Sequence, residues 1–124
     1  MYRPLLVCSY LLNGLAGHSP AAYRAGNLLL HLAVGGLVYL LAWWTVSRRG
    51  AKWATALFLL HPTFSEPVFY LCSRSDSLMV LCAGASLWMY AHNRVGWATV
   101  LGGLAMWSKE TAVVLPLLFL LYEY

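Results

Sequence analysis

The sequence predicts an all-α protein, a polytopic transmembrane bundle of about five short membrane helices preceded by an N-terminal interfacial helix. Its 124 residues are 61% hydrophobic and only 10% charged, whereas a soluble domain carries about 25% charged residues. The mean hydropathy is +0.67. A chain of this length cannot hide so much apolar surface in its own interior, so we expect lipid to cover it. The length fits a single transmembrane domain, residues 1–124.

The N-terminal segment, residues 1–24, is apolar but too interrupted to cross a bilayer. Asn13, Gly14, Gly17 and Pro20 break its apolar run, and a crossing needs about 20 residues. We therefore expect an interfacial or re-entrant helix here.

The expected membrane helices after this segment are residues 25–46, 53–72, 77–91, 95–107 and 111–122. The first is the clearest, because its length at about 1.5 Å per residue gives roughly 33 Å. Pro62 and Pro67 interrupt the second, so we expect a helix to residue 61 and then irregular backbone. Pro116 is expected to kink the last helix.

One face of the first expected helix carries Asn27, His31 and Gly35 at positions i, i+4 and i+8. Polar and small residues in such a stripe are predicted to face neighbouring helices and not lipid. The small residues 83–86 are expected to let the third helix pack closely against its neighbours.

Composition excludes several functions. The net charge is +4, but the cations are spread along the chain and form no basic stripe, so no nucleic-acid partner is predicted. The histidines show no metal-ligand spacing, so no metal and no cofactor are predicted. Cys8, Cys72 and Cys82 have no redox spacing and are expected to be buried free thiols.

The distribution of charge predicts an orientation in the membrane. The loops 47–52 and 92–94 are short and basic and contain no acid, which is typical of cytoplasmic loops. Glu66, Asp76 and Glu110 fall on the other side, which we therefore expect to be periplasmic or lumenal. Ionisable groups near the membrane are costly, so this side is the candidate functional side.

Three short motifs carry the candidate residues, and each has a structural alternative. Glu66 could act as an acid–base group or pair with Arg74 for structure alone. The guanidinium of Arg74 could bind a phosphate, and Asp76 could simply cap the helix that follows. Lys109 could hold an anionic headgroup, or form a surface turn with Glu110.

The order of the motifs resembles that of GT-C glycosyltransferases. The matching motifs are Tyr2-Arg3-Pro4-Leu5, Asn27-Leu28-Leu29-Leu30-His31, His61-Pro62 with Glu66-Pro67-Val68, Ser73-Arg74-Ser75-Asp76, and Ser108-Lys109-Glu110. The chain is most similar to the membrane region of the transmembrane and tetratricopeptide-repeat-containing O-mannosyltransferases and their bacterial relatives, over nearly its whole length.

This resemblance implies a polyprenyl-phosphate sugar as lipid substrate and a hydroxyl acceptor on the lumenal or periplasmic side. It implies that Arg74 and Lys109 lie near the donor phosphate and that Glu66 lies near the reacting sugar as the catalytic residue. The residues expected to support this site are Arg3, His61, Asp76 and Glu110.

The sequence also departs from that family. Such enzymes have more membrane helices and carry an acidic catalytic loop ahead of the Arg-Pro-Leu motif, whereas residues 1–60 contain neither Asp nor Glu. The chain is therefore expected to be a fragment of an enzyme or a truncated descendant. The alternative is a non-catalytic accessory subunit that packs against other transmembrane subunits and membrane lipids. A transporter subunit is disfavoured, because no inverted repeat is visible.

Overall fold

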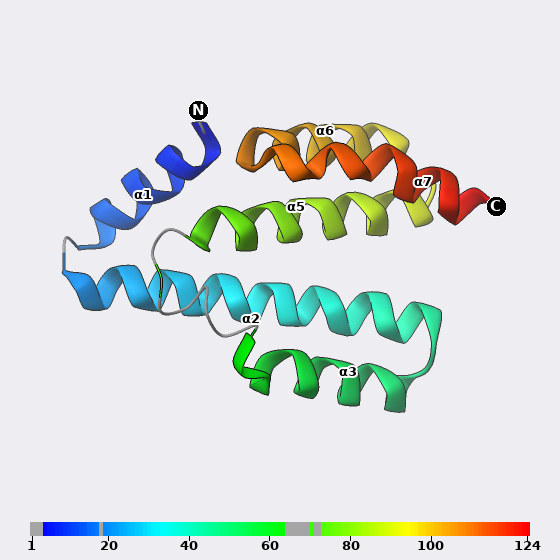
Figure 1. Cartoon of the computed structure of the whole chain (residues 1–124), viewed down its shortest axis with the longest axis horizontal. Helices are drawn as coiled ribbons and strands as arrows, with labels where there is room; N and C mark the ends of the chain where they lie inside the picture. The colour runs from blue at the N-terminus through cyan, green and yellow to red at the C-terminus, as the bar shows by residue number, and fades with distance from the viewer. Residues whose placement is uncertain (1–3, 18, 64–69, 71–72) are drawn as a thin grey trace.

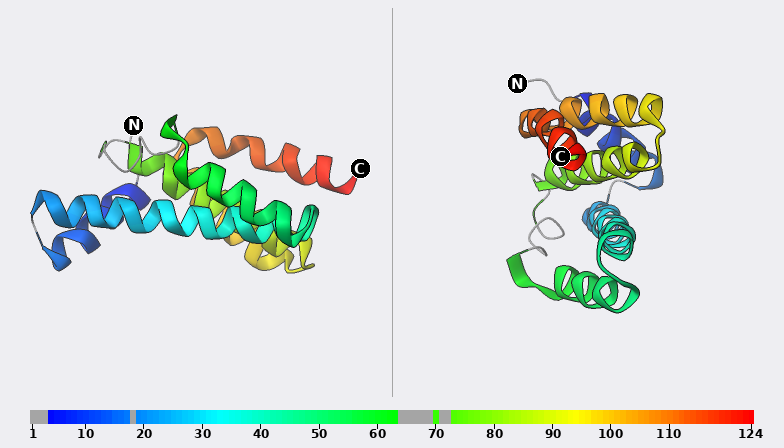
Figure 2. Two further views of the ribbon diagram at one scale, coloured as in Figure 1. Left: turned by 90° about the horizontal axis from the view of Figure 1, so that it is seen from below. Right: turned by 90° about the vertical axis from the view of Figure 1, so that its right-hand side faces the viewer.

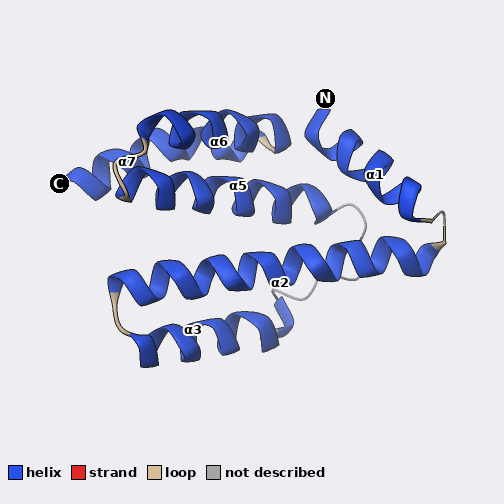
Figure 3. Ribbon diagram, turned by 180° about the vertical axis from the view of Figure 1, so that it is seen from behind, coloured by secondary structure: helices blue, strands red, loops and turns tan. Residues whose placement is uncertain are grey.

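The computed structural model describes residues 4–17, 19–63, 70 and 73–124. The regular structure in these ranges is helical (Figure 3), which confirms the predicted all-α class. The helices are α1 (Pro4–Ala16), α2 (Pro20–Thr45), α3 (Arg48–Leu60), α5 (Arg74–Ala91), α6 (Val95–Ser108), the 3-10 helix η2 (Glu110–Val114) and α7 (Leu115–Glu123).

Within these ranges, α2 is the one helix long and apolar enough to cross a membrane. It has 26 residues, and its most apolar stretch has a mean hydropathy of 1.7. Helices α3, α6 and α7 have 13, 14 and 9 residues, too short at about 1.5 Å per residue for a hydrocarbon core of roughly 30 Å. The structure thus supports one candidate crossing and does not establish the expected bundle of about five.

The helices lie side by side in the order α3, α2, α5, α6, so that α2 lies between α3 and α5 (Figures 1 and 2). Helices α2 and α5 both begin at the end of the bundle where α3 and α6 finish. We call this the motif end, because three of the sequence motifs lie there. At the opposite end, the turn end, α2 continues into α3 and α5 continues into α6.

Helix boundaries differ from the sequence prediction where a cap decides them. Helix α3 begins at Arg48 and not near residue 53, because the Ser47 Oγ accepts a hydrogen bond of 3.1 Å from the Gly50 backbone N–H. The predicted polar loop 47–52 is therefore mostly helix. Pro116 lies in the first turn of α7, which begins at Leu115, and not inside a longer helix, since proline fits the first turn of a helix, where its missing N–H leaves no bond unmade.

The predicted polar stripe of α2 does face its neighbours. Asn27, His31 and Gly35 are buried, as expected. A Cβ placed on Gly35 would lie 2.6 Å from Cδ2 of Leu59 in α3, and a Cβ on Gly84 of α5 would lie 2.4 Å from Cδ2 of Leu37 in α2. These glycines let α2 approach both neighbouring helices closely.

Helices α5 and α6 pack through small residues. The Oγ of Ser86, which is fully buried, donates to the carbonyl oxygen of Ala98 at 2.6 Å. Ala105, Ala112 and Leu115 form the buried cluster beyond it, with Cys82 packed against them. Cys8 is exposed, so the prediction of a buried thiol there is wrong, and Cys72 lies outside the described residues.

Two adjacent glycines of α2 allow a matched test of the α2–α3 contact. We expect Gly36→Ala to stabilise the protein by about 1 kcal/mol through helix propensity, since a Cβ there meets nothing within 4 Å. Gly35→Ala should destabilise it by roughly 1 kcal/mol, because Leu59 must move. Thermal unfolding in detergent, followed by circular dichroism, measures both. Equal stabilisation by the two substitutions would contradict the close packing of Gly35 against Leu59.

Candidate functional site at the motif end

Residues from separate motifs meet where α5 begins and α6 ends (Figure 1). The Oγ of Ser108, the last residue of α6, donates to the carbonyl oxygen of Ser75 at 2.9 Å. Both serines are buried. The next residue, Lys109, forms an ion pair with Asp76 in the first turn of α5. The structure thus brings Arg74 and Lys109 to the same end of the bundle.

Arg74 is the buried cation of this end. It is only 5% exposed. Its Nη2 donates to Oδ1 of Asn13 in α1 at 3.1 Å, and its guanidinium carbon lies 5.2 Å from the centre of the Tyr10 ring. Nε and Nη1 are buried and have no hydrogen-bond partner among the described residues. A buried charge with unpaired donors is costly, so this arginine is suited to receive an anion.

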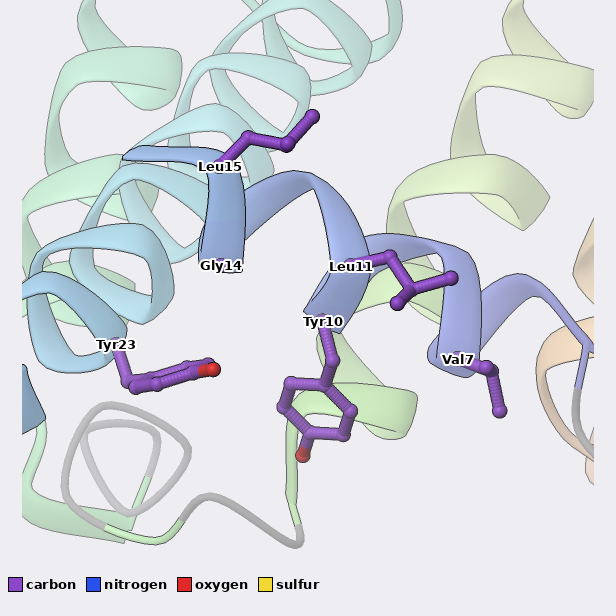
Figure 4. Close-up of a pocket in the computed structure, with 6 residues that line it drawn as sticks. All are labelled: Val7, Tyr10, Leu11, Gly14, Leu15 and Tyr23. Atoms are coloured by element: carbon purple, nitrogen blue, oxygen red, sulfur yellow. The ribbon is translucent and has the colours of Figure 1, made fainter. Parts of the chain in front are cut away.

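A pocket of about 390 Å³ lies between α1 and α2 (Figure 4). Figure 4 shows Tyr23 extending from α2 toward Tyr10, and the two rings meet edge to face with centres 6.2 Å apart. Val7, Leu11 and Leu15 supply apolar side chains to the lining. Because Tyr10 both lines the pocket and contacts Arg74, an apolar surface and a cation adjoin here.

Asp76 is not the helix cap, and Lys109 does not pair with Glu110, which were the two structural alternatives for these residues. Helix α5 begins at Arg74 with Ser73 as its N-cap residue, so Asp76 lies inside the first turn and is not the cap. Its carboxylate pairs with Lys109 instead, across 33 residues of sequence. The charge of Lys109 is thus paired with Asp76, and not with Glu110 as in the structural alternative. The side chains of Lys109 and Asp76 are 31% and 42% exposed, which leaves the pair accessible to a ligand.

A second cavity, of about 290 Å³, lies between α2, α3 and α5. His31 and Asp76 are among its lining residues. The His31 ring stacks on Phe58 with centres 5.2 Å apart, and its Nε2 has no hydrogen-bond partner among the described residues. Both polar side-chain atoms of the neighbouring Asn27 are likewise buried and unpartnered there. Unpaired polar atoms of this kind call for an explanation such as a ligand or bound water.

The remaining predicted residues are placed less centrally or lie outside the description. His61 is the exposed C-cap residue of α3, and its Nδ1 accepts from the Thr63 backbone N–H at 3.3 Å. Glu110 is exposed at the first residue of η2. Arg3 and Glu66 lie outside the described residues, so the role of Glu66 stays a prediction.

Sequence reasoning missed Tyr10 and Asn13, which hold the Arg74 guanidinium. Asn13 stood out only as an interruption of an apolar segment. A polar amide inside such a segment is a signal for a buried partner, because burial without a hydrogen bond is unfavourable. The partner is Arg74, 61 residues further along the chain, and the local sequence pattern could not predict it.

The Ser108 hydrogen bond gives a test of how the motifs are held together. We expect Ser108→Ala to destabilise the protein by about 1 kcal/mol, because a buried bond between α6 and α5 is lost. The control is Thr99→Ala, since the exposed Thr99 hydroxyl donates to the carbonyl oxygen of Val95 in its own helix. Thermal unfolding in detergent compares them, and a larger loss in the control would count against the contact.

The site combines a buried arginine, two of whose donors have no partner among the described residues, with apolar pockets at one end of an apolar helical protein. Comparison with known proteins shows that the chain is homologous to a segment of a GT-C-type family of membrane glycosyltransferases. No family model matches the chain, and no solved structure matches it.

The relatives are TMTC protein O-mannosyl-transferases. The chain is 35% identical to protein O-mannosyl-transferase Tmtc1 of Drosophila melanogaster over 126 aligned residues, which cover 94% of this chain. It is 39% and 37% identical to TMTC1 of Mus musculus and Homo sapiens over 64% of its length. The chain spans 15% of the fly protein and 9% of each mammalian protein. The resemblance seen in the motifs is thus confirmed.

Proposed function

We propose that this chain forms the donor-phosphate-binding part of a membrane O-mannosyltransferase, which transfers mannose from a polyprenyl-phosphate donor to a hydroxyl acceptor on the non-cytoplasmic side. The observation that carries this proposal is the buried Arg74 guanidinium with unpartnered Nε and Nη1. The homology to O-mannosyl-transferases supplies the sugar and the reaction type.

The chemistry of the reaction requires such a cation. Transfer breaks the bond between the sugar C1 and the phosphate oxygen, and forms a bond between C1 and the acceptor oxygen. Negative charge grows on the departing phosphate, and fixed N–H donors that face it stabilise the transition state. Asn13 and Tyr10 hold Arg74 in place, so its free donors need little reorganisation. A guanidinium suits a phosphate because it can donate two parallel hydrogen bonds.

Lys109 supplies a second positive charge at the same end of the bundle, and Asp76 balances it. In our proposal the donor phosphate competes with the Asp76 carboxylate for Lys109. The proton of the acceptor hydroxyl needs a base, and in our proposal Glu66 is the candidate for that role. The apolar wall of the pocket between α1 and α2 would receive the part of the polyprenyl chain next to the phosphate.

Ligand discrimination tests this function. The chain, purified in detergent, is titrated with polyprenyl-phosphate mannose, with the same polyprenol lacking phosphate, and with phosphatidylglycerol. We expect the phosphorylated donor to bind at least about tenfold more tightly than the polyprenol, given roughly 1.5–3 kcal/mol for hydrogen bonds to charged groups. Equal binding of all the lipids would refute a donor site.

An accessory role is the second candidate, and one observation favours it. Large apolar side chains of α6 and α7 are exposed, for example Trp97 at 62%, Trp107 at 62% and Leu120 at 66%. These surfaces suit partner transmembrane helices or lipid. If this role is correct, the chain co-purifies with a larger membrane assembly and Glu66→Gln changes no activity of that assembly. A chain that is stable and monomeric in detergent argues against it.

A further inference from the structure

Three tryptophans gather at the turn end of the bundle, far from the motifs. Trp43 and Trp44 lie in the last turn of α2, and Trp88 lies near the end of α5. Together they line a cavity of about 290 Å³, which we call the tryptophan cage. Trp43 and Trp44 are 47% and 44% exposed, so the cage is open to its surroundings.

Neighbouring rings support the cage. The centre of the His92 ring lies 4.4 Å from that of Trp88 and 6.4 Å from that of Trp44. The centre of the Tyr122 ring lies 5.6 Å from that of Trp44. Contacts at these distances restrict the indole rings, so the cage is organised before any ligand enters.

The electrostatics of the cage favour a cation. Indole faces attract positive charge, and the Arg48 guanidinium carbon already lies 5.3 Å from the centre of the Trp43 ring. Helices α2 and α5 both end here (Figure 1), and the carbonyl ends of helices carry partial negative charge. A cation with weakly held water gains most from aromatic faces, because little hydration is lost. A quaternary ammonium is such a cation.

Positive charge adjoins the cage. Helix α3 begins beside it, with Ser47 as N-cap and Arg48 and Arg49 as its first residues. The Gly50 N–H is already bonded to the Ser47 hydroxyl, but the N-terminus of the helix carries partial positive charge, which suits a phosphate. Arg48 and Arg49 are both exposed. The turn end thus places aromatic faces beside a positively charged helix start.

We propose that the tryptophan cage binds the headgroup of phosphatidylcholine, with the quaternary ammonium between the indole rings and the phosphate at the start of α3. This ligand carries both charges on one short group, as the site requires. Membrane position favours the lipid over a soluble choline compound, because Trp43 and Trp44 lie at the end of α2, the candidate membrane crossing. The proposal does not depend on the transferase function.

The test measures headgroup selectivity. The full chain in detergent is titrated with short-chain phosphatidylcholine, phosphatidylglycerol and free phosphocholine, and bound ligand is counted by native mass spectrometry. Phosphatidylcholine is expected to bind about five- to tenfold more tightly than phosphatidylglycerol, the range for loss of a cation–aromatic contact. Equal affinity for both lipids indicates an unselective aromatic belt and overturns the proposal. Phosphocholine binding as tightly as the lipid also overturns it.

Variants assign the selectivity to the cage. Trp44→Leu and Trp88→Leu should each remove most of the preference for phosphatidylcholine. Trp97→Leu is the matched control, since Trp97 lies near the turn end on α6, is 62% exposed and does not line the cage. Trp88→Phe keeps a weaker aromatic face, so it should retain part of the preference if Trp88→Leu fails to fold. The proposal is contradicted if the two single variants Trp44→Leu and Trp88→Phe both fold and both keep the full preference for phosphatidylcholine.

Discussion

Replacing Arg74 by glutamine is expected to weaken the binding of polyprenyl-phosphate mannose by about ten- to a hundredfold, while the binding of the unphosphorylated polyprenol stays unchanged. The reason is the burial of the guanidinium and its free Nε and Nη1 donors. Hydrogen bonds from a charged donor contribute roughly 1.5–3 kcal/mol each, and every 1.4 kcal/mol changes affinity about tenfold. Titration of both lipids in detergent measures the difference.

Controls separate this effect from charge and from folding. Arg24→Gln removes a cation that is exposed near the start of α2, so it should change affinity little. Arg74→Lys keeps the charge and loses the planar donor fork, and should bind with intermediate affinity. If folded Arg74→Gln binds the phosphorylated donor as tightly as the original chain, Arg74 is not a phosphate ligand.

The second large effect is expected at Ala105, where α6 meets the buried cluster. Ala105 is 0% exposed and packs with Ala112 and Leu115. Ala105→Leu inserts a larger side chain into this filled space and should lower the free energy of unfolding by up to about 3 kcal/mol. The lower midpoint of thermal unfolding in detergent reports it.

The neighbouring Met106 supplies the matched control for this packing prediction. It is 47% exposed, so Met106→Leu conserves volume on the surface of the helix and should leave the midpoint nearly unchanged. If Ala105→Leu has the same midpoint of thermal unfolding as Met106→Leu, the contact between α5, α6 and α7 is not packed as the structure describes.

Hydrophobic pattern predicted the existence of the helices better than their ends. Apolar runs mark α2 and α6 well, because burial or lipid contact requires such runs. Their boundaries depend on caps such as Ser19 and Ser47, whose hydroxyls accept from backbone N–H groups at 3.2 Å and 3.1 Å. Composition alone placed the residues after Ser47 in a loop, because polar residues are common both in loops and in first turns.

In the candidate site, the local sequence predicted the charged residues but not their partners. The sequence singled out Arg74 and Lys109 as charges between apolar segments, which local pattern can show. It did not predict the partners Asn13 and Asp76, because these lie far away along the chain and only the packing of α1, α5 and α6 decides them. The tryptophan cage was hidden for the same reason, since Trp88 joins Trp44 only after α2 and α5 pack together.

A donor-phosphate site at the motif end requires that the motif residues share one membrane surface, opposite the turn end. Single cysteines can be introduced at exposed positions after the native cysteines are replaced: Thr63 and Glu110 at the motif end, Arg49 and Arg94 at the turn end. In sealed vesicles, a membrane-impermeant thiol reagent should label the first pair from one side and the second pair from the other. Labelling of residues 63 and 110 from opposite sides would contradict a shared phosphate site.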